Sequence, residues 1–225
     1  NDFKTFSFLP WLRRGLANDL TGQAGQRATV TVDLEIQGTD TNGNTVSQPV
    51  SRDVQVYGPG DVVGLDEKNI IRTEPKHWIT NFEPNYLAFV DLYDEDLPWR
   101  YSPDTPTNDR LRPWLALIIL KEEEFSDVPV RPGQPLPAIK FLSADPLAHL
   151  PAVDELWAWS HVQLNESVTE GTARATNTTT IAGRVEDLLD SDSDMGFSRI
   201  ICPRRPEPNA AYHAFLVPTF ESGRL

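Results

Sequence analysis

The chain has 225 residues, of which 39% are hydrophobic, so it can bury a sizeable core in a single compact unit. Its 19 prolines against 13 glycines favour short strands joined by stiff connections and argue against an all-helical fold. A formal net charge of −13 argues against nucleic acid and anionic membranes as partners, because both bind clustered Lys and Arg.

Two further features bear on where the protein folds. The single cysteine, Cys202, cannot form an internal disulfide, which is typical of proteins that fold in the cytoplasm. The longest apolar run, Trp114 to Leu120, has seven residues, whereas a bilayer-spanning helix needs roughly 20. We therefore predict no transmembrane segment.

The chain starts at Asn1 without a methionine and ends directly after a strand pattern, so we expect the N-terminal part of a longer protein.

Residues 1–26 form an apolar N-terminal segment. Pro10 is placed to begin a short helix over residues 11–17. The segment is too apolar to remain in water, and no hairpin holds it, so we interpret it as an assembly arm that docks on a neighbouring subunit. The alternative is that it packs back on its own domain. The candidate partner-binding residues are the large apolar ones, Phe3, Phe6, Phe8, Leu9 and Trp11.

The clearest local pattern is a β-hairpin near the start of the chain. Residues 27–37 alternate apolar and polar side chains, which predicts a half-buried strand. Asn42-Gly43 supplies a tight turn, and residues 46–57 return with Val50, Val54 and Val56. The polar stretch 38–44 is expected to project as the loop tip.

The run from Trp114 to Leu120 is bounded by Pro113 and by charged residues, which predicts a strand buried on both faces at the centre of a sheet. Further strands are predicted over residues 87–93, 154–164, 198–203 and 211–220. Ile181, Val185, Leu188 and Leu189 recur at helical spacing and predict the one long helix.

These elements place residues 27–225 in a single β-rich domain. The expected fold class is mainly β (α+β), either β-sandwich-like or a mixed sheet, with long proline-rich loops and one or two short helices. Residues 128–137 are expected to be a stiff polyproline-like connector, and residues 166–180 a mobile loop.

One stretch could be drawn as a sugar site, because paired carboxylates and aromatic rings are the groups that glycan-binding and glycan-cleaving proteins use. Its candidate residues are Asp94, Asp96, Trp99 and Tyr101. The competing interpretation is an acidic strand end, with the rings packed on the sheet and Arg100 paired to a neighbouring acid. We favour this second interpretation, because sequence cannot show the separation of two carboxylates.

Other motifs are incomplete. Asp190, Asp192 and Asp194 resemble the opening of a calcium loop, but Ile201 stands where a bidentate glutamate is required. The glycine-rich stretch 57–64 has the wrong spacing for a dinucleotide loop. The four histidines and Cys202 have no zinc spacing. We predict no catalytic residue, no cofactor and no metal site.

Five stretches carry a resemblance to a known group of proteins. They are VYGPGDVVGLD (56–66), FEPNYLAFVDLYDEDLPWRYSP (82–103), RLRPWLALIILKEEEF (110–125), ELWAWSHV (155–162) and CPRRPEPNAAYHAFLVPTFESGRL (202–225). Together they resemble the N-terminal region of large, poorly characterised bacterial proteins associated with contractile injection systems, which are phage-tail-like particles. The group has no established catalytic motif, so the resemblance implies no site residue.

The resemblance implies a structural subunit at the cap or baseplate of such a particle, not an enzyme. Its partners would be other subunits of a large assembly, with a homo-oligomer as one arrangement. Assembly would take place in the cytoplasm of a bacterium, with a released or membrane-anchored particle as the end product. The alternative function is a glycan-binding or glycan-hydrolysing module, which rests on the acidic and aromatic stretch around Trp99.

Overall fold

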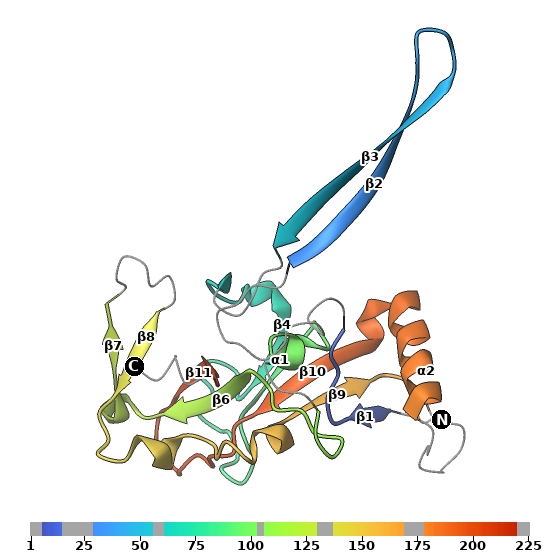
Figure 1. Ribbon diagram of the computed structural model, residues 1–225. Helices are drawn as coiled ribbons and strands as arrows, with labels where there is room; N and C mark the ends of the chain where they lie inside the picture. Colours follow the sequence, from blue (N-terminus) through green and yellow to red (C-terminus); the bar gives the residue numbers. More distant parts are fainter. Residues whose placement is uncertain are drawn as a thin grey trace.

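We analysed a computed structural model of the chain, which describes residues 6–14, 29–55, 61–102, 106–129, 137–168 and 178–219. The fold is mainly β, with two α-helices in the described residues, as the sequence predicts (Figure 1). All strand pairs described are antiparallel, so of the two expected arrangements the mixed sheet does not apply.

The largest sheet has five strands in the order β1-β9-β10-β5-β4. Their bounds are Ser7–Leu9 (β1), Ser160–Leu164 (β9), Gly196–Ile201 (β10), Phe89–Leu92 (β5) and Ile70–Glu74 (β4). One face of this sheet is buried, because Val162, Leu164 and Ile200 point inward and have no exposed surface. The central strand is β10, which the sequence predicts at residues 198–203 as one of several closing strands.

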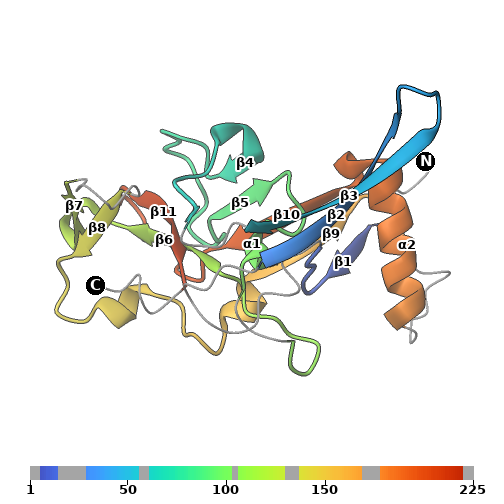
Figure 2. The same ribbon diagram turned by 45° about the horizontal axis from the view of Figure 1, so that its top comes forward.

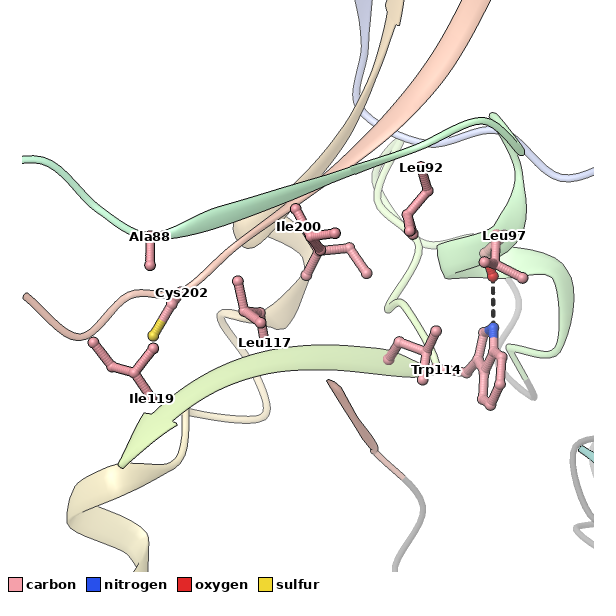
Figure 3. Packing of buried hydrophobic residues seen from close by; sticks show 10 residues of the cluster. Ala88, Leu92, Leu97, Trp114, Leu117, Ile119, Ile200 and Cys202 are labelled. Carbon is pink, nitrogen blue, oxygen red and sulfur yellow. Dashed lines mark hydrogen bonds between the residues drawn. The ribbon is translucent and has the colours of Figure 1, made fainter. Parts of the chain in front are cut away.

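Strand β6 (Leu115–Leu120) is the apolar run of the sequence, and all six of its residues are buried. Its burial confirms the prediction that both faces are covered. Among the described strands it pairs only with β11 (His213–Pro218), so the prediction that it lies at a sheet centre is wrong. Leu117 and Ile119 point across to Ile200 of the larger sheet and to Cys202, which follows β10 (Figure 3). Sandwich-like packing joins these two sheets.

A second apolar cluster lies under the other end of the five-stranded sheet. Helix α2 (Thr178–Ser191) contributes Val185 and Leu189, which confirms the helix predicted from their spacing. A Cβ atom added at Gly196 would lie 2.7 Å from Leu189 Cδ2, so a larger residue here would force the Leu189 side chain to shift. The short helix α1 (Leu97–Arg100) adds Trp99 to the same cluster.

Strands β2 (Thr29–Thr39) and β3 (Thr45–Gln55) form the predicted hairpin, with Gly43 at φ 84° in the turn. The prediction that its strands are half-buried is wrong, because nearly every side chain of both strands is exposed. Figure 1 shows the reason: the hairpin extends away from the sheets, and in the turned view of Figure 2 it comes forward of them.

Two other local predictions need correction. Residues 156–159 form a 3-10 helix, not the first half of a strand, and β9 begins at Ser160. The N-terminal segment forms strand β1, and residues 11–14, the described part of the predicted helix, are not helical.

The remaining elements are a small hairpin and four more 3-10 helices. The hairpin pairs β7 (Phe125–Val128) with β8 (Ala138–Phe141), and the 3-10 helices span Glu67–Asn69, Glu122–Glu124, Pro146–His149 and Ser193–Met195. Most of the predicted connector and mobile loop, residues 130–136 and 169–177, and half of the glycine-rich stretch, residues 57–60, lie outside the described residues.

Candidate interaction surfaces

The hairpin β2–β3 has two chemically different faces. Residues opposite each other in the antiparallel register share a face. The apolar face consists of the pairs Val30–Val54, Val32–Arg52, Leu34–Val50, Ile36–Gln48 and Gly38–Val46. Leu34 is 54% exposed, Ile36 56% and Val46 50%, so this face lies in water.

The opposite face of the hairpin is polar and internally bonded. Thr31 Oγ1 donates a hydrogen bond of 2.7 Å to Asp53 Oδ1 across the two strands, and Ser47 donates to Glu35 in the same way. At the tip, Asp40 accepts hydrogen bonds from the backbone N–H groups of Asn44 and Asn42, which lower the pKa of its carboxyl. Strand pairing and turn therefore define the hairpin locally, without support from the body.

An apolar stripe of this length in water indicates a contact surface. A two-stranded hairpin without further packing is at best marginally stable, and contiguous apolar patches on soluble proteins mark interaction sites. Covering the stripe removes apolar area from water, which contributes roughly 25 cal/mol for each Å². The alternating sequence pattern predicts two faces, but it cannot predict that the apolar one is left exposed by the elements that the structure describes.

The N-terminal segment is divided between core and surface. Leu9 and Trp11 pack against the second apolar cluster, and Trp11 Nε1 donates to the carbonyl of Asp109 at 3.1 Å. Phe6 and Phe8 are exposed, whereas Phe3 lies outside the described residues. No hairpin holds this segment, as expected, but β1 pairs with β9 and is an edge strand of the main sheet.

Phe8 lies beside charged and aromatic groups on the outer face of that sheet. Its ring meets the His161 ring edge to face, with centroids 5.6 Å apart. Burial and the nearby Arg199 guanidinium both lower the pKa of His161. Arg199 and Arg72 share the carboxylate of Asp91, which is 1% exposed, with Nε to oxygen distances of 2.6 Å and 2.8 Å. We assign this row to sheet stability, because both guanidinium groups bind the buried carboxylate of Asp91 and lie over the ring of Phe89.

The four residues of the predicted sugar site do not form an open site. Trp99 is fully buried and donates its indole N–H to the carbonyl of Leu111 at 3.1 Å, so its ring cannot stack on a sugar. Asp96 and Asp94 both bind the Arg100 guanidinium. The ring of Tyr101 packs edge to face against Trp114. The competing interpretation, with packed rings and paired acids, describes the geometry.

An exposed aromatic loop is a surface that the sequence analysis does not predict. Trp78, in the loop between β4 and β5, is 98% exposed and has a positive φ of 61°. Tyr86 and Ile79 of the same loop are also exposed. The residues around Trp78 show no apolar periodicity, so the sequence pattern alone could not predict that this side chain is exposed.

Within the described ranges, no three His, Cys, Asp or Glu side chains are arranged to hold a metal ion. None of the helices in those ranges has the length and apolar character needed to cross a bilayer. Comparisons with protein-family models, with curated proteins and with solved structures found no match.

Proposed function

We propose that this chain is a structural subunit of a contractile injection system or related phage-tail-like particle, at its cap or baseplate, where it makes protein–protein contacts. The observation that carries the proposal is the projecting hairpin β2–β3, whose apolar face lies in water. The resemblance of residues 56–66, 82–103, 110–125, 155–162 and 202–225 to proteins associated with such particles supplies the biological context.

The geometry fits an assembly role better than a catalytic one. Each strand of the hairpin has 11 residues, which corresponds to roughly 37 Å of extended chain. This reach lets a subunit contact a neighbour at a distance from its own core. The exposed Trp78 loop offers a second apolar contact, and aromatic side chains commonly anchor protein interfaces.

The proposal is tested by isolating particles from the source bacterium and analysing them by mass spectrometry. We expect the chain to be present in intact particles. We also expect the variant Leu34→Glu, which places a carboxylate on the apolar face, to be lost from them. The matched control is Gln37→Glu, which adds the same charge to the opposite face of the same strand and should be retained. Intact particles that lack the wild-type chain would refute the proposal.

A further inference from the structure

We infer that the apolar face of the hairpin β2–β3 is covered by the same face of a second copy of this chain, stacked antiparallel across a two-fold axis. The inference rests on the proposed function only in taking this face as a protein contact. It adds the identity of the partner and the register of the contact.

The distribution of polar residues on the face is the first argument. On the β2 side, every residue from Val30 to Ile36 that points to this face is apolar. On the β3 side, valines at 46, 50 and 54 alternate with Gln48 and Arg52. The two polar residues lie symmetrically, two positions on either side of Val50. The face is therefore a near-palindrome centred on the pair Leu34–Val50.

A two-fold axis through that centre, perpendicular to the strands and within the interface, brings like strands over each other. Leu34 then lies on Leu34 of the second copy, and Val50 on Val50. Arg52 lies over Gln48 of the second copy, where its guanidinium can donate a hydrogen bond to the amide oxygen. Gly38 at the tip lies over Val30 at the base. Each apolar side chain meets a small or apolar one, and each polar one meets a partner.

The parallel stack lacks this match. An axis along the hairpin would bring β2 over β3 at the same level, so that Arg52 would lie on Val32 of the second copy and Gln48 on Ile36. Both polar groups would then lose water without gaining a partner, which disfavours this arrangement. The antiparallel stack also agrees with the near-alignment that packed sheets adopt at a spacing of about 10 Å.

The charge of the chain does not oppose this contact at physiological salt. The acids of the two strands, Asp33, Glu35 and Asp53, all point to the polar face, away from the interface. Across two stacked hairpins the acids of the two copies lie roughly 20 Å apart, which exceeds the screening length of about 8 Å.

The size of the face predicts a weak dimer. A surface of roughly 37 by 10 Å on each copy totals roughly 800 Å², which is below the roughly 1,200 Å² of a standard stable interface. The isolated chain should therefore associate only at high concentration. In an ordered assembly, where copies are held close together, the same contact would be occupied.

The experiment is sedimentation velocity on residues 1–225 from about 1 µM to about 1 mM, the range in which an interface of this size dissociates. We expect a monomer–dimer equilibrium. Leu34→Glu should weaken it by about tenfold or more, because both copies then bury a carboxylate, and Gln37→Glu should leave it nearly unchanged. Circular dichroism on each variant verifies that the body remains folded.

The register is tested at Gln48. Gln48→Glu should tighten the dimer about threefold or more by facing Arg52 of the second copy, and Gln48→Lys should weaken it by a similar factor. Thr45→Glu on the polar face is the matched control and should not tighten it. A monomer throughout the concentration range, or equal effects of Gln48→Glu and Gln48→Lys, would overturn the inference. If the chain is a monomer in sedimentation but present in intact particles, the dimer contact is refuted and the proposed function stands. If the chain dimerises as predicted but is absent from intact particles, the proposed function is refuted and the dimer contact stands.

Discussion

At the scale of single residues, the most consequential polar cluster joins three segments that are distant in sequence. Arg204, after β10, donates to both carboxylate oxygens of Glu124 at 2.7 and 2.8 Å and to the carbonyl of Ile119 at the end of β6. His149 Nδ1 lies 3.1 Å from Arg204 Nη1 and 3.9 Å from Glu124. These bonds lower the pKa of Glu124 from 4.5 to about 2, mainly through the Arg204 hydrogen bonds.

This shift predicts a pH-dependent stability. The unfolded chain binds a proton at Glu124 at higher pH than the folded chain does, so the stabilisation is complete above pH 4.5 and is lost as the pH falls toward about 2. Glu124→Gln should reduce the free energy of unfolding at pH 7 by up to about 3 kcal/mol, and by much less near pH 2. Urea denaturation at several pH values measures this. An equal loss at every pH would show that the ion pair is not the cause.

The direction of each side chain explains why the predicted sugar site does not form. Sequence spacing shows that Asp94, Asp96 and Trp99 are near one another, but it does not show the direction in which each side chain points. In the fold, Pro98 lies in the first turn of α1, and Trp99 is turned into the core. Asp96 is buried and Asp94 is partly exposed, and Arg100 binds both carboxylates.

At the scale of elements, periodicity predicts element type well and pairing poorly. The hairpin and helix α2 agree with their patterns within a few residues, because turn chemistry and helical spacing are local. The apolar run of β6 predicts burial, but a run without alternation carries no information about which strand lies beside it. For this reason the central strand is β10, and β6 lies in a separate sheet.

The structure changes the interpretation of strand β1, which the sequence places in an assembly arm. Deleting residues 1–15 removes its pairing with β9 and the packing of Leu9 and Trp11, which are partly buried in the second apolar cluster. We expect the melting temperature of the remaining chain to fall by roughly 10 °C, as the loss of a few kcal/mol implies for a chain of this size. Phe6→Ala, at an exposed position beside β1, should have little effect in the same thermal scan. An unchanged melting temperature on deletion would restore the assembly-arm interpretation.

At the scale of the whole molecule, five arginines of the body are committed to internal ion pairs. Arg14, Arg72, Arg100, Arg199 and Arg204 all bind carboxylates of the same chain. With a formal net charge of −13, the protein is left with an excess of acids at its surface. The hairpin face presents Val32, Leu34, Ile36, Val46 and Val54 in water, and it can associate without charge attraction.

The most direct measurement of that claim is thiol labelling of introduced cysteines. The only cysteine of the sequence, Cys202, is buried and does not contribute a fast background. Leu34→Cys places a thiol on the apolar face, and Gln37→Cys places one on the opposite face of the same strand. Maleimide labelling rates are compared between the dilute isolated chain and the assembled particle.

In the dilute chain, both thiols should react at similar rates, since both positions are exposed. In the particle, we predict that the labelling rate of the Leu34→Cys thiol falls at least about tenfold. This ratio corresponds to a free energy of roughly 1.4 kcal/mol for uncovering the thiol. The Gln37→Cys thiol should keep the rate that it has in the dilute chain. Equal labelling of the Leu34→Cys thiol in the dilute chain and in the particle would contradict the assignment of this face as an assembly surface.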